Sequence, residues 1–379
     1  MGTESVTPRR SAVPFLDLGP SHSVLKQQIL AAVSELIEEG AFTNGSQVAT
    51  FETAFAEYCG TRHAVGLASG LDALRLGLLA AGIEPGDEVV VPAATFVATL
   101  EAVTQARGRP VVVDIGDSDY GLDIEATAAA LGPRVRFLLP VHLYGQMADL
   151  RGILRLASEN GLQVVEDACQ AHGASRDGLR AGAGGLAGAF SFYPAKNLGA
   201  FGDAGALVTD DEDLAARVRA LREHGQREKY RHEIEGYTAR LDTIQALVLL
   251  CKLASLDAWN DQRRAGARRY AEALTGVGDL RLPPVATGSQ PVWHLFVVQT
   301  AHPIRLAAYL AERGIGTGRH YPEPPHLSAA FAFLGHKCGE FPVAERLARQ
   351  TLSLPLFPGI SDAQIDAVVQ AVGAYFRDG

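Results

Sequence analysis

Seven short runs of strand character between residues 63 and 210 constrain the fold of this chain more than any other feature. The runs are 63–69, 88–94, 109–115, 136–144, 162–168, 187–193 and 204–210. They are continuously apolar rather than alternating, which is typical of strands covered on both faces. Stretches of helical periodicity, such as 71–82 and 147–161, separate most of them. The sequence therefore predicts an α/β fold, a three-layer sandwich around a mostly parallel seven-stranded sheet.

The pattern changes after residue 211. Long helical stretches are followed by one strand-like run and two further helices, at 211–225, 240–276, 292–300, 304–314 and from Ile360 onward. This order predicts a smaller α+β domain at the C-terminal end. We expect a mobile tail, a large domain and a small domain at residues 1–13, 14–255 and 256–379.

Charge and composition exclude several classes of protein. The net charge is −9, and no basic cluster exceeds local pairs such as Arg263–Arg264, which argues against a nucleic-acid partner. No signal peptide or membrane-length apolar run is apparent, so a soluble protein is expected. The four cysteines, Cys59, Cys169, Cys251 and Cys338, form no CxxC pair. We therefore expect no disulfide framework and no metal site, and the cytoplasm as location.

One lysine, Lys196, lies between an aromatic run and a glycine-rich run in "SFYPAKNLGAFGDAGALVTD". Asp167 ends a different strand-like run 29 positions earlier. Because ligands bind at the carboxyl ends of parallel strands, we expect the amine and the carboxylate at one edge of the sheet. Pyridoxal phosphate needs a lysine for its Schiff base and an acid beside its ring nitrogen. The alternative interpretation is a surface lysine at the junction of a strand and a loop.

A phosphate cradle is expected as well. Ser69 and Gly70 lie between a strand-like run and a helical stretch, so the first amides of that helix can hold an anion. On its own this signal is weak. Together with Lys196 and Asp167 it favours a pyridoxal-phosphate enzyme.

The chain resembles the DegT/DnrJ/StrS-type sugar aminotransferases, which are pyridoxal-phosphate enzymes of fold type I. The resemblance spans most of the chain. The matching segments are "FLDLGP", "EYCGTRHAVGLASGLDAL", "GDEVVVPAATFVAT", "LLPVHLYGQMADL", "VVEDACQAHGA", "FSFYPAKNLGAFGDAGAL", "RLDTIQA", "WHLFVV", "HYPEPPHL" and "LSLPLFPGIS". They arrive in the order and at the intervals of that family.

The resemblance implies a role for individual residues. Lys196 is similar to the Schiff-base lysine, Asp167 to the partner of the pyridinium nitrogen and Phe96 to the ring that stacks on the cofactor. Gln170 is similar to the residue beside the O3′ edge of the cofactor. The residues that resemble the phosphate cradle are Ser191 and the backbone amides of Gly70 and Leu71.

Two positions depart from the pattern of the family. Leu71 stands where Thr or Ser is common, and Thr238 stands where Asn is common. Leu71 offers no hydroxyl and Thr238 has a shorter reach than Asn, so we expect weaker retention of the cofactor. In the family that Asn enters from a partner subunit, which implies a homodimer with shared active sites and an inactive monomer.

The reaction implied by the resemblance is transfer of an amino group, with glutamate as the expected donor and pyridoxamine phosphate as the aminated cofactor. Lys196 is the expected acid and base. The acceptor is expected to be a nucleotide-linked ketosugar, at C3 of a thymidine-diphosphate 3-keto-6-deoxyhexose. Amination at C4, a keto-cyclitol acceptor and a non-catalytic regulator of the same fold remain alternatives.

Further residues are candidates for contact with the substrates. Tyr193, His320 and Tyr321 each carry a polar tip on a rigid ring, although packing alone explains them equally well. Arg240 has the geometry to hold the carboxylate of glutamate, and its alternative role is an ion pair with Asp242 or another neighbour. Three other histidines are expected to be packing residues and receive no role, namely His142, His172 and His326.

Overall fold

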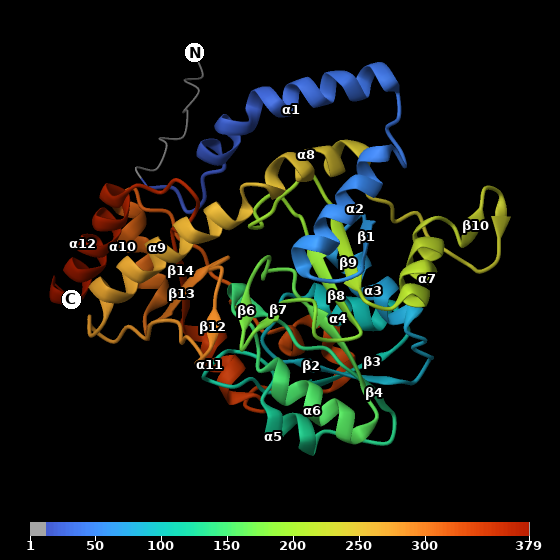
Figure 1. Ribbon diagram of the computed structural model, residues 1–379. Coiled ribbons are helices and arrows are strands. Elements are labelled where there is room, and N and C mark those ends of the chain that lie inside the picture. Colours follow the sequence, from blue (N-terminus) through green and yellow to red (C-terminus); the bar gives the residue numbers. More distant parts are fainter. Residues whose placement is uncertain (1–12, 379) are drawn as a thin grey trace, which may run out of the picture.

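A seven-stranded sheet lies at the centre of the computed structural model, which describes residues 13–378 (Figure 1). Its strands are β1 (His63–Leu67), β2 (Glu88–Pro92), β3 (Arg109–Val113), β4 (Val135–Leu138), β5 (Gln163–Asp167), β8 (Ala187–Ser191) and β9 (Gly205–Thr209). Their order is β1-β9-β8-β5-β4-β2-β3, and only β9 runs antiparallel to its neighbours. The predicted sheet is confirmed, with all seven expected runs in it.

Helices cover both faces of this sheet. The helices of this part of the chain are α1 (Gly19–Glu39), α2 (Ser46–Cys59), α3 (Gly70–Ala80), α4 (Ala98–Gln105), α5 (Ile124–Ala129), α6 (Leu150–Asn160), α7 (Glu212–Arg222) and α8 (Thr243–Leu253). Helices α3, α4 and α7 contribute to one apolar core, and α2, α6 and α8 to the other. On β2, Val89 and Val91 belong to the first core and Val90 to the second. This alternation of buried side chains explains why the runs are continuously apolar.

The C-terminal part forms a smaller α+β unit with its own apolar cluster. It contains α9 (Leu256–Leu274), α10 (Pro303–Glu312), α11 (Pro342–Gln350), α12 (Asp362–Asp378), β13 (Phe296–Gln299) and β14 (Thr351–Leu354). Short elements complete the chain, namely β6 (Ser175–Arg176), β7 (Leu179–Arg180), β10 (Gln226–Glu228), β11 (Arg231–His232), β12 (Ser289–Gln290) and the 3₁₀ turns Leu143–Gly145, Pro325–Leu327 and Ala329–Leu334. The helical stretch expected at 240–276 is two helices, α8 and α9, with a break at Ala254–Ser255. The predicted domain boundary next to this break stays a prediction.

The glycine-rich segment after β7 is held by a buried carboxylate. Glu166 accepts hydrogen bonds of 2.8 Å from the backbone N–H groups of Gly182, Gly184 and Gly185. It also accepts one of 2.8 Å from Nε2 of His142, whose Nδ1 accepts the N–H of Ala148 and which therefore carries its proton on Nε2. Glu166 thus anchors this turn behind β5, the strand that ends at Asp167.

Three expectations concern the ends and the surface of the chain. Residues 1–12 of the expected tail lie outside the described residues. Val13, the last residue of the tail expected at 1–13, is buried, and its backbone is hydrogen-bonded to Gly314. The four cysteines are free. Within residues 13–378 no cluster of side chains is suited to a metal ion, and no helix is long and apolar enough to cross a membrane.

Candidate active site

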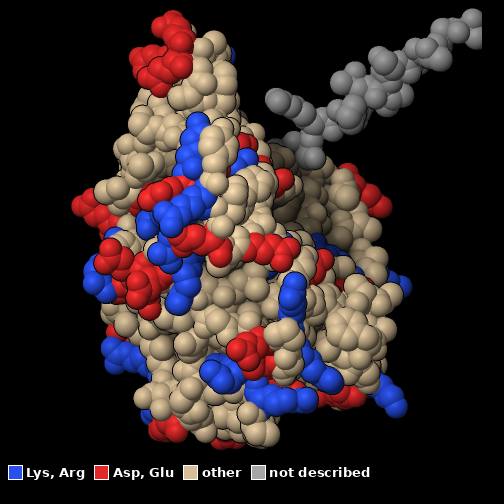
Figure 2. Space-filling view, turned by 90° about the vertical axis from the view of Figure 1, so that its right-hand side faces the viewer, with Lys and Arg blue, Asp and Glu red and all other residues tan. Residues whose placement is uncertain are grey.

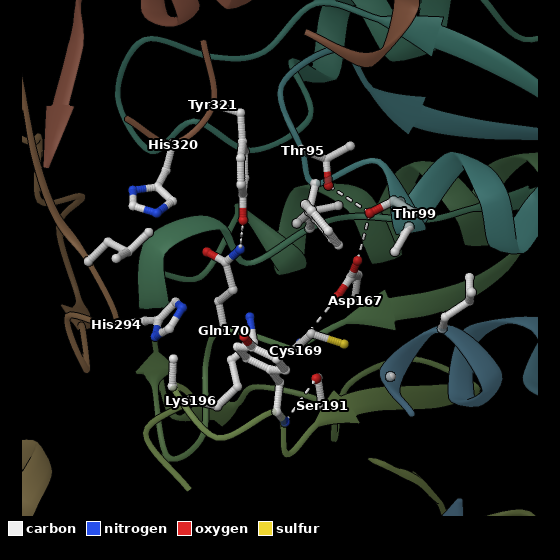
Figure 3. Close-up of a pocket in the computed structure, with 18 of the residues that line it drawn as sticks. Thr95, Thr99, Asp167, Cys169, Gln170, Ser191, Lys196, His294, His320 and Tyr321 are labelled. Carbon is white, nitrogen blue, oxygen red and sulfur yellow. Dashed lines mark hydrogen bonds between the residues drawn. The ribbon is translucent and has the colours of Figure 1, made fainter. Parts of the chain in front are cut away.

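A cavity of about 460 Å³ opens at the carboxyl edge of the sheet, between the sheet and the C-terminal part of the chain. Figure 3 shows the side chains that line it. The predicted site residues in its wall are Ser69, Gly70, Leu71, Phe96, Asp167, Gln170, Ser191, Tyr193, Lys196, His320 and Tyr321. Strands from distant parts of the sequence therefore deliver these residues to one place.

Lys196 and Asp167 reach the cavity from adjacent strands. β5 and β8 pair in parallel with Asp167 opposite Ala189, and Lys196 follows β8 by five residues. Among residues 13–378 the Lys196 amine has no hydrogen-bond or ion-pair partner. Burial lowers the pKa of Lys196, while Cys169 and Asp167 act in the opposite direction. A buried amine with a lowered pKa is suited to attack a carbonyl carbon.

Two threonines that the sequence analysis did not single out orient the Asp167 carboxylate. Thr99 Oγ1 donates a hydrogen bond of 2.8 Å to Asp167 Oδ2, and it lies 2.6 Å from Thr95 Oγ1. The backbone N–H of Cys169 donates to Asp167 Oδ1 at 3.2 Å. Both threonines occur in "ATFVAT", so the spacing of two hydroxyls after a strand was the available signal. The carboxylate is thereby fixed at the floor of the cavity (Figure 3).

The start of α3, where the anion cradle is expected, lies at the cavity. Ser69 caps the helix by accepting the N–H of Asp72 at 3.0 Å, and Arg75 lies 2.6 Å from Asp72, so this acid is paired. A Cβ at Gly70 would lie 2.7 Å from both Cys169 Sγ and Ser191 Cβ. Only glycine therefore allows the N-terminal amides to approach Ser191 this closely.

These residues fit pyridoxal phosphate. The helix start and Ser191 suit its phosphate, Asp167 suits its ring nitrogen, and the unpartnered amine of Lys196 suits its aldehyde. The groups that suit the phosphate, the ring nitrogen and the aldehyde thus lie at three points of one cavity. Phe96, with half of its surface exposed at the cavity, offers a ring face.

Gln170 is held in one orientation by two partners. The backbone N–H of Tyr144 donates to Gln170 Oε1 at 2.7 Å, so the amide nitrogen points the other way and donates to the Tyr321 hydroxyl at 3.2 Å. The Tyr321 ring lies 5.3 Å from the Phe96 ring. Gln170 therefore connects the large sheet to the segment around His320.

Lys196 influences the pKa of three histidines, of which His172 and His294 are buried and His320 is half-buried. Burial, with the charge of Lys196 as a second cause, lowers the pKa of His172 to about 3 and that of His320 to about 4. The same two causes hold the pKa of His294 well below its usual range. All three imidazoles are neutral at pH 7. His294 lines the cavity beside Lys196 and was missed in the sequence, where "WHLFVV" carries no spacing that marks it (Figure 3).

Two predicted residues do not line this cavity. Thr238 Oγ1 lies 3.0 Å from His224 Nε2, and Arg240 Nη1 lies 2.9 Å from Glu223 Oε1. The neighbour that pairs with Arg240 is thus Glu223 and not Asp242. Within one chain, the structure does not bring Thr238 and Arg240 to Lys196.

Comparison with known proteins identifies the family. Residues 23–373 match the model of the DegT/DnrJ/EryC1/StrS aminotransferase family. The dTDP-3-amino-3,4,6-trideoxy-alpha-D-glucose transaminase of Streptomyces venezuelae is 47% identical over 372 residues, which are 98% of this chain and 97% of the relative.

Solved structures agree. DesV of S. venezuelae, solved in complex with a ketimine intermediate, superposes with a TM-score of 0.94 at 47% identity, covering 96% of this chain and 98% of DesV. NtdA of Bacillus subtilis, solved with bound PMP, has a TM-score of 0.89 at 31% identity, covering 97% and 86%. With its fold, its cavity and these relatives taken together, the chain belongs to the DegT/DnrJ/EryC1/StrS family of sugar aminotransferases.

Proposed function

We propose that this chain uses pyridoxal phosphate to transfer an amino group from glutamate to C3 of a thymidine-diphosphate-linked 3-keto-6-deoxyhexose. The observation that carries the proposal is that Lys196 and Asp167 line the same cavity. An amine without a protein partner lies beside a carboxylate that Thr99 holds in place. Both roles that the cofactor requires are thereby supplied by neighbouring strands.

Residues of this chain have separate roles in the proposed reaction. The bound cofactor supplies an electron sink for the carbon that loses its proton. Asp167 would hold the proton on the ring nitrogen, and Ser191 with the amides of Gly70 and Leu71 would hold the phosphate. Lys196 Nζ would take the proton from the substrate carbon and return it, and the lowered pKa of Lys196 favours the neutral amine that this role needs.

Amination at C3 is supported by the relatives, and a sugar as the acceptor is supported by the cavity. The S. venezuelae relative is named for a 3-amino sugar linked to dTDP. Near Lys196 the cavity offers neutral hydrogen-bonding groups, on His294, His320 and Tyr321. Such groups suit the hydroxyls of a neutral sugar ring. Amination at C4 and a keto-cyclitol acceptor are the alternatives that the experiment below separates.

The active enzyme is proposed to be a homodimer in which Thr238 of one subunit completes the phosphate site of the other. Its placement outside the cavity of its own chain suits this arrangement. Apolar side chains on and just after α1 are largely exposed, with exposed fractions of 79% for Val24, 63% for Ile37 and 54% for Phe42. A second copy of the chain would cover such residues.

The β10–β11 hairpin provides cations for the diphosphate of the substrate. Figure 2 shows basic and acidic side chains gathered on the face that carries α7 and this hairpin. Arg227 and Lys229 line a surface cleft there. Arg319, the residue before His320, donates to the backbone carbonyls of Thr351 and Ala348 and is held by its own fold. Within one chain neither Arg227 nor Lys229 lines the cavity of Lys196, and Arg227 lies 3.2 Å from Glu233, so the assignment of the diphosphate to these two residues rests on the proposed dimer.

The test is a half-reaction. The protein is loaded with pyridoxamine phosphate, and thymidine-diphosphate 3-keto and 4-keto 6-deoxyhexoses are added separately. Return of the visible absorbance of the cofactor with the 3-keto sugar alone supports the proposal. Return only with the 4-keto sugar moves the position of amination, and return with neither points to a cyclitol. A Lys196→Ala variant, which has no amine to bind the cofactor, is the matched control.

A further inference from the structure

Asn197, the residue after Lys196, is buried and bonded to the C-terminal part of the chain. Its Nδ2 donates a hydrogen bond of 2.8 Å to Asn260 Oδ1 on α9 and one of 2.9 Å to the backbone carbonyl of Val292. Only 4% of Asn197 is exposed, and Asn260 is fully buried. The amide of Asn197 therefore joins the lysine loop to two segments that lie about 60 and 95 positions further along the chain.

The orientation of both amides is fixed by the backbone. Asn260 Nδ2 donates to the His172 carbonyl at 2.9 Å, so Asn260 Oδ1 faces Asn197 and accepts. The Val292 carbonyl is an acceptor too, so Asn197 must present its nitrogen on this side. Both hydrogens of that nitrogen are used. The buried Asn197 Oδ1 has no partner among residues 13–378, and turning the amide over would bring this oxygen against two acceptors.

The segment bonded to Asn197 also carries His294 into the cavity. Val292 N–H donates to the Gly145 carbonyl at 2.9 Å, and Leu295 N–H donates to the Tyr144 carbonyl at 3.3 Å. Between them Trp293 has a φ of 47°, in the left-handed region that side chains rarely adopt. The Asn197 bond to Val292 thus fixes the segment that places His294 beside Lys196.

We propose that Asn197 is a positioning residue that sets Lys196 and His294 relative to each other through its paired hydrogen bonds to Val292 and Asn260. The inference rests on the proposed function, because it takes Lys196 as the residue that binds the cofactor. A proton transfer by Lys196 depends on the placement of its amine, and small displacements of a reacting group cost large factors in rate. Asn197 does not line the cavity, and its fixed amide holds the Lys196 amine in place from outside it.

The experiment compares three variants of the full-length protein loaded with cofactor. Asn197→Leu removes both hydrogen bonds, and Asn197→Ser retains one donor. Tyr270→Phe removes a different buried bond, from the Tyr270 hydroxyl to the Pro355 carbonyl at 2.8 Å, in the apolar cluster of the C-terminal unit, and Tyr270 does not line the cavity. The measurements are kcat, KM, the pH midpoint of the visible absorbance of the bound cofactor, and the thermal unfolding midpoint.

Asn197→Leu is expected to lower kcat about tenfold or more with little change in KM, and to shift the pH midpoint by about half a unit or more. Asn197→Ser is expected to lie between this variant and the wild type. Tyr270→Phe is expected to lower the unfolding midpoint without changing kcat or the pH midpoint.

A wild-type pH midpoint in both Asn197 variants would overturn the inference, as would an equal shift in Tyr270→Phe. If Asn197→Leu does not fold, the serine variant alone decides between these outcomes. A wild-type protein that never acquires a visible band bound at Lys196 would instead overturn the proposed function.

Discussion

In the proposed phosphate site, Leu71 offers a backbone N–H but no hydroxyl. Its side chain is half-buried and packs against the core under α3. Leu71→Thr is expected to tighten pyridoxal phosphate binding about tenfold, since a hydrogen bond to a charged group contributes about 1.5–3 kcal/mol and some packing is lost. Titration of the visible absorbance with cofactor measures the Kd. Leu79→Thr, in the same helix but away from its start, is expected to leave the Kd unchanged, and equal Kd values for Leu71→Thr and wild type would contradict the prediction.

Lys196 is a buried cation, so it costs stability when no cofactor is bound. Because its pKa in the folded protein is lowered, the unfolded chain binds the proton more tightly, and protonation favours unfolding. Lys196→Met is expected to raise the unfolding midpoint of the cofactor-free protein at pH 7. The gain shrinks as the pH rises through the folded pKa of Lys196 towards the ordinary lysine value of about 10.4. Thermal unfolding from pH 7 to 10.5 measures this, and a variant less stable than wild type at pH 7 would refute it.

At the scale of elements, the turn behind β5 depends on the charge of Glu166. Burial opposes its ionisation, but the hydrogen bonds from His142 and from the backbone of Gly185 and Gly182 outweigh burial and hold its pKa below the usual range. Glu166→Gln places an N–H group against donors and is expected to destabilise the protein by about 2 kcal/mol at pH 7.

The pH dependence of this loss has a defined sign. A carboxylate with a lowered pKa stabilises the fold above its unfolded pKa of about 4.3 and loses this contribution as the pH falls through the folded value. The difference between Glu166→Gln and wild type should therefore be constant from pH 6 to 8 and shrink below about pH 4. Denaturant unfolding over this range tests it, with Glu159→Gln on the exposed side of α6 as control.

Local pattern was enough to predict the elements but not their long-range partners. The seven apolar runs predicted the sheet because a strand that is buried on both faces is apolar at successive residues. Lys196 and Asp167 were predictable because Asp167 ends β5 and Lys196 lies in the loop that follows β8. Thr99 and Asn197 were not, since a hydroxyl or an amide acquires its role from a partner that lies 63 to 95 positions away. The break between α8 and α9 was not predicted either, because the helical pattern of the sequence continues across it.

At the scale of the whole molecule, the proposed homodimer with shared active sites predicts that two inactive variants restore activity together. Lys196→Ala removes the amine, and Thr238→Glu places a carboxylate where the partner's cofactor phosphate would lie. Each variant alone is expected to be inactive. When the two are co-expressed in equal amounts, about half of the dimers contain one chain of each kind, and each of these has one intact site, so about a quarter of the wild-type activity returns. Co-expression of Lys196→Ala with Asp167→Asn restores nothing, because both changes lie in the cavity of their own chain. If the Thr238→Glu mixture stays as inactive as this control, Thr238 acts within its own subunit or not at all.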